Sequence, residues 1–302
     1  MKTIQYHLIA LFVIIIWGTT FVATKRLLYT GLSPGDIFFY RFFLAYIGIW
    51  FFGPRRLFAA SFKDELLLVC IGITGGSLYF IAGNTALRIT HASNVALLAC
   101  TAPIITILLS RLFIKPAGAA ALATNTESKK NNRLWLGSFL AFTGVVFVIL
   151  NGRFILQINP LGDMLGLTAA LSWALYTILL KRLGSNYSML FITRKVFFYG
   201  LLTMLPLFLL SPLNKNTQVL LHPVIIGNLV YLALMSSLLC YFLWNTVVKN
   251  LGAVRANNYV YLSPVVTMAA SVIVLKETIT PMAIIGALLI LTGVALAEKQ
   301  VQ

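Results

Sequence analysis

The chain has 302 residues, of which 60% are hydrophobic and only 10% are charged, with 23 Lys and Arg against 7 Asp and Glu. About 25% of the residues of an ordinary soluble domain are charged, so this composition excludes a soluble globular enzyme, a disordered chain and a secreted disulfide scaffold. It indicates an all-α polytopic membrane protein.

The net charge of +16 is spread in short groups between apolar runs, such as Arg55-Arg56, Lys129-Lys130 and Lys181-Arg182. Nucleic-acid binding normally needs one clustered basic face. Scattered groups are typical of cytoplasmic loops under the positive-inside rule. We therefore expect a small-molecule substrate and the lipid bilayer as partners, and no nucleic acid; a monomer is compatible with the sequence, which leaves the oligomeric state open.

Ten apolar runs are long enough to cross the bilayer as helices, which takes about 20 residues each. Turn-forming pairs such as Gly53-Pro54 and Asn159-Pro160 separate them, and the polar segment 115–133 is expected to be the one long loop. The runs lie at 7–24, 36–52, 65–85, 92–111, 134–150, 163–180, 189–210, 223–247, 256–275 and 281–297.

Ten spans place both termini on one side of the membrane. With that side taken as cytoplasmic, 16 of the 23 basic residues fall on the inner side and 7 on the outer side. The positive-inside rule then favours cytoplasmic termini. The expected location is the cell membrane, as a multi-pass protein of a bacterial plasma or inner membrane.

An internal repeat relates the two halves of the sequence. Residues of the first half recur 156 positions later in the first span, 161 later in spans 3 and 4, and 149 later in span 5. The last drop, 161 − 149 = 12, matches the extra length of the 115–133 loop. The pairs are Trp17/Trp173, Lys25/Lys181, Asn84/Asn245, Pro103/Pro264, Gly137/Gly286 and Gly144/Gly293.

Each half contains five spans, and because five is odd the second half must enter the membrane from the opposite side. We expect a first repeat at 1–150, which includes the 115–133 loop, and a second, inverted repeat at 151–302. Inverted repeats provide two equivalent gates around a site at the membrane midplane, which is the geometry of alternating access. The pattern therefore predicts a transporter.

The order of these residues resembles the ten-helix EamA-type exporters of the drug/metabolite transporter superfamily. The resemblance covers essentially the whole chain and implies two inverted five-helix bundles, a central cavity lined mainly by helices 1, 3, 4, 6, 8 and 9, and export of small metabolites such as amino acids. One departure is the acid at Glu277, because Pro116 stands at the equivalent place in the first half. The resemblance rests on Trp17 with Lys25-Arg26, Trp173 with Lys181-Arg182, the segment from Asn84 to Pro103, Pro264, Lys276-Glu277, Gly286 and Gly293.

Asn84 and Asn245 are the leading candidates for substrate binding, because an amide at membrane depth is costly unless it is paired. An interhelical hydrogen bond is the equally weighted alternative. Tyr79 and Tyr241 precede them at spacings of five and four. These spacings differ by about 100° around a helix, so at most one Tyr shares the face of its Asn.

Four more residues complete the expected site. Trp17 and Trp173 are predicted to form a gate or a cavity wall, with packing against small neighbours as the alternative. Asn94 is a further candidate ligand, as is Tyr259, for which a place in the interfacial aromatic belt is favoured. Pro103 and Pro264 lie within helices 4 and 9 and are predicted to act as hinges.

The charged residues give a less direct signal. We expect Arg41 to snorkel to the interface, with a substrate carboxylate or Asp36 as alternative partners, and Arg194 likewise. Asp64-Glu65 is interpreted as a solvated turn. No acid lies at a helix centre, which argues against a cation/proton antiporter and leaves a facilitated exporter, or one coupled through an acid at a helix end, open.

Three functions are compatible with a membrane protein of this composition. A secondary exporter of small amphipathic metabolites is favoured, and we expect no catalytic residues, no cofactor and no metal. A membrane-embedded transferase is the first alternative, but the sequence lacks the metal, nucleophile and phosphate-binding motifs that it would need. A non-transporting scaffold is the second alternative, and the internal duplication argues against it, because a scaffold does not need such a repeat.

Overall fold

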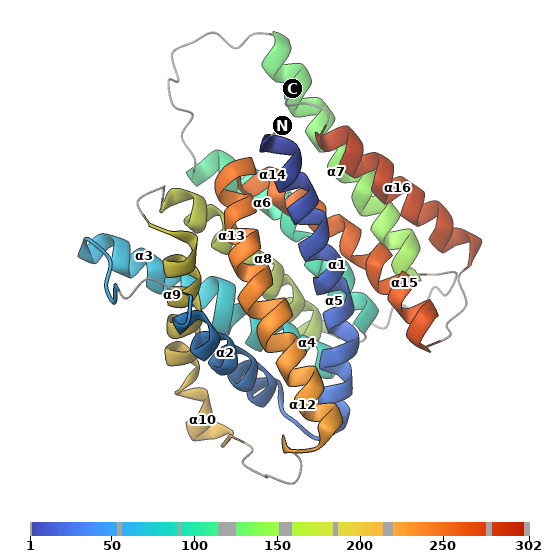
Figure 1. Ribbon diagram of the computed structural model, residues 1–302. Helices are drawn as coiled ribbons and strands as arrows, with labels where there is room; N and C mark the ends of the chain where they lie inside the picture. The colour runs from blue at the N-terminus through green and yellow to red at the C-terminus, as the bar shows by residue number, and fades with distance from the viewer. Residues whose placement is uncertain are drawn as a thin grey trace.

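The computed structural model describes residues 2–52, 56–89, 92–113, 125–150, 159–183, 187–213, 220–275 and 280–298. These residues form helices and short connections, with no strand among them. The all-α prediction is confirmed. The start of α1 and the end of α16 lie at the same end of the bundle, at the top of Figure 1.

All ten apolar runs are helical, and several are built from more than one segment. The first half contains α1 (Lys2–Tyr29), α2 (Pro34–Trp50), α3 (Phe62–Gly72) with the π-helical turn η1 (Ile73–Ser77) and α4 (Leu78–Ile89), α5 (Ala92–Ala99) with α6 (Ala102–Phe113), and α7 (Asn125–Leu150). The second half contains α8 (Pro160–Arg182), α9 (Met189–Met204) with α10 (Leu207–Leu210), α12 (Pro223–Val230) with the π-helical segment η2 (Tyr231–Leu239) and α13 (Cys240–Leu251), α14 (Ala253–Asn258) with the 3-10 turn η3 (Tyr259–Leu262) and α15 (Ser263–Leu275), and α16 (Pro281–Glu298).

Two expectations need correction. The 115–133 loop is shorter than predicted, because α7 already begins at Asn125; residues 114–124 lie outside the described part of the chain. Pro103 and Pro264 are not inside continuous helices but are the second residues of α6 and α15. Proline suits the first helical turn, where its missing N–H has no partner to lose. The α-helix is interrupted just before each proline, by a turn at residues 100–101 in span 4 and by the 3-10 turn η3 in span 9.

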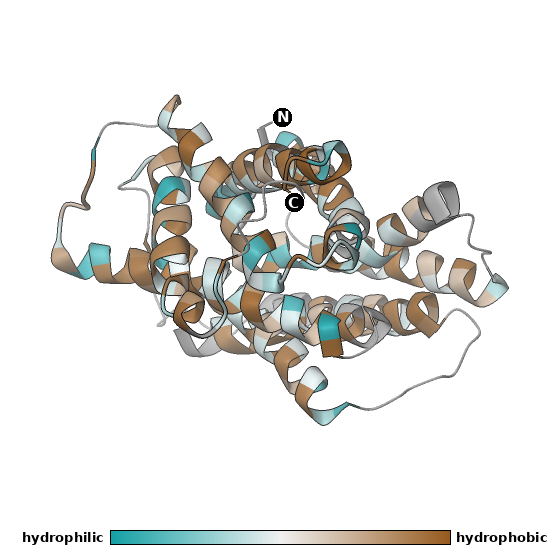
Figure 2. Cartoon of the chain, turned by 90° about the horizontal axis from the view of Figure 1, so that it is seen from below, coloured by the Kyte–Doolittle hydropathy of each residue, from teal (hydrophilic) through white to brown (hydrophobic). Residues whose placement is uncertain are grey.

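Length and apolar composition separate the membrane-crossing helices from the connections. Four stretches of the described chain are long and apolar enough to span a bilayer, and four shorter helices are apolar as well. Their outward faces carry exposed hydrophobic side chains such as Leu8 and Phe12 on α1 and Ile284, Leu288 and Leu291 on α16. Figure 2 shows the same dominance of hydrophobic residues along the helices. These faces suit contact with lipid, since water would leave them uncompensated.

Helix ends follow local sequence signals. Ser33 begins α2 with a reciprocal cap, in which its hydroxyl accepts the Asp36 N–H at 3.0 Å and the Asp36 carboxylate accepts the Ser33 N–H at 2.8 Å. Asn159 caps α8 through the Gly162 N–H at 3.0 Å. Gly252, with φ +89°, makes the sharp turn from α13 to α14 that a residue with a Cβ rarely adopts.

The contacts between helices occur twice, with the first and second halves exchanging roles. Helix α1 packs on α13 and α15, and its sequence counterpart α8 packs on α4, α5 and α6. Likewise α2 packs on η2 while α9 packs on η1. The predicted boundary between residues 150 and 151 borders 151–158, which lie outside the described residues, so the two-repeat division stays a prediction that these contacts support.

The last helices of the two halves, α7 and α16, pack against each other along much of their length, on the right of Figure 1. Their contact is made by glycines. A Cβ placed on Gly144 would lie 2.5 Å from the Gly286 carbonyl oxygen, and one on Gly137 would lie 2.6 Å from that of Gly293. Small residues let two backbones touch in a membrane, where close packing rather than hydrophobic burial drives association.

We predict that Gly144→Ala lowers the stability of the protein by about 1–3 kcal/mol, because its methyl group overlaps backbone atoms that no side-chain rotation can move. The measurement is the midpoint of thermal unfolding in detergent. Gly227→Ala is the matched control, since a Cβ on this exposed helical glycine meets nothing within 4 Å. Equal midpoints for the two variants would refute the packing argument.

Candidate functional site

A cavity of about 140 Å³ lies between the two halves of the bundle. Its wall comes from spans 1, 3, 4, 6, 8 and 9, as the sequence resemblance implied, with one addition from span 2, Arg41. The expected site residues among its lining are Trp17, Tyr79, Asn84, Trp173, Tyr241 and Pro264.

The lining residues come from one half of the membrane thickness. On α1 they run from Ile14 to Thr24, and on α8 from Gly166 to Trp173, which is the part of each helix farther from the chain termini. We call this the cavity half of the bundle, and the part near the termini the sealed half.

Aromatic rings close the inner end of the cavity. The ring centroids of Trp17 and Trp173 are 5.2 Å apart with an 83° interplanar angle, and Trp17 also lies 5.1 Å from Trp244. Both cavity-lining indoles are satisfied: Trp17 Nε1 donates to the Ser236 carbonyl at 3.0 Å and Trp173 Nε1 to Asn257 Oδ1 at 3.2 Å. Edge-to-face pairs of this kind are favourable and rigid, so the two tryptophans form the cavity floor.

Beyond this floor, the sealed half is held by buried polar side chains. Asn257 Nδ2 donates to Thr106 Oγ1 at 2.5 Å and to Thr177 Oγ1 at 3.1 Å, and so ties α14 to α6 and α8. The His7 Nδ1 atom lies 2.5 Å from the Tyr259 hydroxyl. The Asn257–Thr106 and His7–Tyr259 contacts join helices of opposite halves, while the Asn257–Thr177 bond joins two helices of the second half. The sealed half therefore stays closed only while the two halves keep this arrangement.

Asn84 and Asn245 occupy equivalent sequence positions but have different surroundings. Asn245 is fully buried in the sealed half, where it accepts a hydrogen bond from the Tyr176 hydroxyl and donates one to Thr193 Oγ1 at 2.8 Å. Asn84 lines the cavity, and within the described part of the chain its amide has no hydrogen-bond partner. Asn245 therefore forms interhelical hydrogen bonds, which was the alternative to substrate binding. Asn84 instead presents its amide at the cavity wall.

Helix direction explains the difference between the two Tyr–Asn pairs. Tyr79 and Tyr241 both line the cavity, and the Tyr241 hydroxyl donates to the Gly75 carbonyl at 2.6 Å. The residues of α4 that follow Tyr79 lie in the cavity half, whereas the residues of α13 that follow Tyr241 lie in the sealed half. Asn84 consequently remains in the cavity with Tyr79 in spite of the five-residue spacing, whereas Asn245 does not.

The remaining candidates fall outside the cavity wall. The side chain of Asn94 is outside the described part of the chain. Tyr259 is only 6% exposed and contacts His7, so its expected place in the interfacial belt is wrong. Pro103 is buried next to the break in span 4 but does not line the cavity, in contrast to Pro264.

The snorkelling expected of the two arginines is also wrong. Arg41 is 5% exposed and lines the cavity, where Nε donates to Ser237 Oγ at 2.5 Å and Nη2 to Ser236 Oγ at 2.7 Å. Arg194 is 2% exposed, donates to the Arg56 carbonyl, and lies 4.6 Å from the centroid of the Trp50 ring. Sequence reasoning missed both, because the acceptors come from distant segments.

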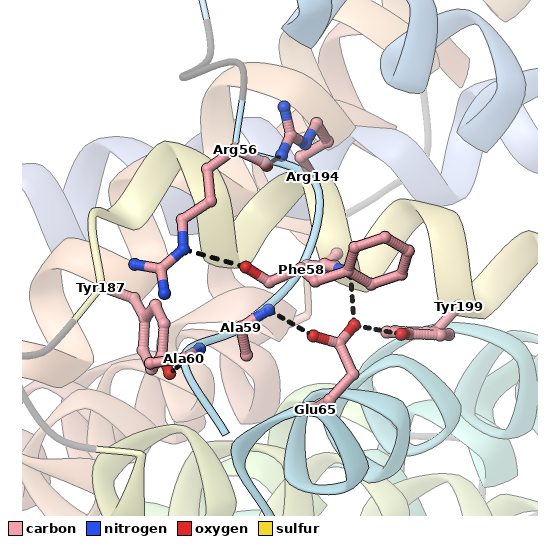
Figure 3. A network of polar contacts seen from close by, with 9 residues as sticks. Arg56, Phe58, Ala59, Ala60, Glu65, Tyr187, Arg194 and Tyr199 are labelled. Carbon is pink, nitrogen blue, oxygen red and sulfur yellow. Dashed lines mark hydrogen bonds and ion pairs between the residues drawn. The ribbon is translucent and has the colours of Figure 1, made fainter. Parts of the chain in front are cut away.

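Figure 3 shows a second polar cluster, which surrounds Glu65 at the start of α3. The Glu65 carboxylate accepts from Lys195 and Tyr199 of α9 and from the Ala59 N–H at 2.5 Å. Its neighbour Asp64 accepts from the Tyr187 hydroxyl at 2.6 Å. The interpretation of Asp64-Glu65 as a solvated turn is therefore wrong.

Tyr187 lies in the connection between α8 and α9. Burial and the hydrogen bond to the Asp64 carboxylate raise the pKa of Tyr187. Its phenol therefore remains a donor at neutral pH, and the cluster fixes span 3 to span 7 outside the cavity.

Comparison with known proteins agrees with this architecture. The model of the EamA-like transporter family matches the chain twice, over residues 5–150 and 160–298. The chain belongs to the EamA-like transporter family. It is therefore a multi-pass membrane protein of a transporter family.

Relatives of the chain include an uncharacterized transporter of Archaeoglobus fulgidus, 28% identical over 97% of each chain. A second relative, from Escherichia coli, is named a probable amino-acid metabolite efflux pump and is 28% identical over 94% of this chain and 92% of its own length. A crystal structure that is 17% identical superimposes with a TM-score of 0.69 over 98% of this chain and 96% of the other. That superposition shows a shared fold.

The different environments of the two asparagines predict different reactivity. In a background in which Cys70, Cys100 and Cys240 are replaced by serine, Asn84→Cys should react with a water-soluble thiosulfonate, because position 84 faces the cavity. Asn245→Cys should react only after denaturation. Labelling is followed by mass spectrometry, with Ala86→Cys as the buried control on the same helix. Similar rates at positions 84 and 245 would contradict the assignment of the cavity and sealed halves.

Proposed function

We propose that the chain is a secondary exporter of small amphipathic metabolites, amino acids or related compounds, that works by alternating access. The observation that carries the proposal is the asymmetry between equivalent residues: Asn84 faces the cavity while Asn245 is bonded into the sealed half. In an inverted repeat, exchanging the two environments produces a cavity that faces the other side.

Exchanging the two environments would change the hydrogen-bond partners of both asparagines. Tyr176, which holds Asn245, lies 156 positions after Thr20, and Thr20 lines the cavity together with Asn84. When the cavity half closes, Thr20 is the counterpart that can bond to Asn84, and Asn245 is released. The breaks before Pro103 and Pro264 lie at the point where spans 4 and 9 would bend during this exchange.

The cavity wall suits an uncharged or anionic amphipathic solute. Aromatic rings of Trp17, Trp173 and Tyr79 provide apolar surface, and Asn84 and Thr24 provide hydrogen-bonding groups. The name of the E. coli relative supports amino acids as the first solutes to test.

The proposal is tested by solute flux in proteoliposomes. Vesicles loaded with a mixture of radiolabelled amino acids should lose them down their gradient faster with the protein than without it. Asn84→Ala and Asn245→Ala should each reduce this flux, because each removes a bond from one of the two closed states. Gly227→Ala is the control. Absence of gradient-dependent movement of any amino acid or related solute would refute the proposal.

The inverted arrangement has its own test. Arg26 and Arg182 carry exposed side chains at equivalent positions near the ends of α1 and α8. With cytoplasmic termini, Arg26→Cys should react with a membrane-impermeant maleimide added outside intact cells, and Arg182→Cys only in inverted vesicles. Labelling of both from one side would exclude mirrored halves and, with them, alternating access between equivalent gates.

A further inference from the structure

Among the described residues that line the cavity, one is charged: Arg41, in the first part of α2. Its guanidinium is 5% exposed and stands 4.6 Å from the centroid of the Phe80 ring, which also lines the cavity. A guanidinium stays charged at any physiological pH and offers five N–H donors. Burying such a charge costs several kcal/mol unless it is compensated.

The protein compensates this charge only in part. Two of the five donors bond to the neutral hydroxyls of Ser236 and Ser237, and the other three have no acceptor among the described residues. No carboxylate of the described chain lies within salt-bridge distance of Arg41, and the nearby Asp36 is engaged as a helix cap. The described residues that line the cavity include no Asp or Glu. The positive charge therefore faces the space that the solute would occupy.

We infer that Arg41 binds the carboxylate of the transported solute, so that the substrates are small carboxylates with an apolar remainder. The inference rests on the proposed transport function and narrows its substrate class. A planar fork of N–H donors matches a carboxylate, and the charge-assisted bonds replace the water that the buried guanidinium lacks. The apolar part of the solute then lies against Trp17 and Trp173, and Asn84 is placed to bond a polar group at its other end.

Ser236 and Ser237 act as positioning residues in this arrangement. They belong to the π-helical segment η2 and hold Nε and Nη2 from the side of α12–α13, so that the remaining donors point away from them. Because η2 belongs to the second half and α2 to the first, movement of the halves relative to each other changes the support of the guanidinium. Carboxylate binding is thereby linked to one conformation of the transporter.

The test compares matched acids and amides on the purified protein. N-acetylleucine and N-acetylleucinamide differ in the carboxylate alone, and leucine with leucinamide forms a second pair. Quenching of tryptophan fluorescence reports binding, since Trp17 and Trp173 line the cavity. We expect each acid to bind about 10-fold or more tightly than its amide, as for charge-assisted hydrogen bonds of about 1.5–3 kcal/mol. Equal affinity of acid and amide overturns the inference without any variant.

Variants then assign the preference to one residue. Arg41→Gln should remove the acid preference, and Arg41→Lys, which keeps the charge but not the planar fork, should retain part of it. Arg182→Gln removes an exposed arginine and should leave the preference unchanged. An acid preference that persists in Arg41→Gln overturns the inference. Chloride that displaced bound N-acetylleucine with the affinity of N-acetylleucine itself would indicate a general site for inorganic anions, and this too overturns the inference.

The outcomes separate this inference from the proposed function. Flux of a solute in proteoliposomes with no binding of either acid leaves the transporter intact and rejects the role of Arg41. Absence of flux for every solute rejects the transporter itself, and the assignment of Arg41 with it.

Discussion

Polar groups inside a bilayer need partners, and in this structure two equivalent asparagines differ in whether the described residues provide them. In the sealed half, Asn245 and Asn257 are satisfied by hydroxyls from neighbouring helices. In the cavity half, Asn84 relies on water or solute. The same residue types recur in both halves, and this recurrence is what the proposed exchange between two arrangements of similar energy requires.

A buried arginine adds a second constraint to the first. The guanidinium of Arg41 is held by serines of the opposite half and lacks a carboxylate among the described residues. A solute that supplies the missing negative charge stabilises the conformation in which these contacts exist. A solute without that charge leaves the protein to bear the cost of burial. Under the proposed role of Arg41, selectivity and conformational change would both follow from the same unpaired positive charge.

The sequence was sufficient for the helices, because apolar length is a property of single segments, and it indicated most of the cavity wall only through the resemblance to EamA-type exporters. It was insufficient for Arg41 and Glu65. Hydropathy places a charge near a span end and cannot tell an interface from a packed interior, since that depends on partners 196 and 130 positions away in Ser237 and Lys195. The environments of Asn84 and Asn245 could not be predicted for a related reason. Two similar repeats do not reveal at which end of the bundle the cavity lies.

The glycine contact between α7 and α16 bears on how the halves can move. Where two main chains touch directly, as at Gly144 and Gly286, there are no side chains between them to rearrange into a new register. Sliding one helix along the other would bring bulkier residues against the opposing backbone, whereas rotation about the contact preserves it. The pair is therefore suited to act as a fixed pivot at the edge of the molecule, about which a small rotation would become a larger displacement at the proposed gates.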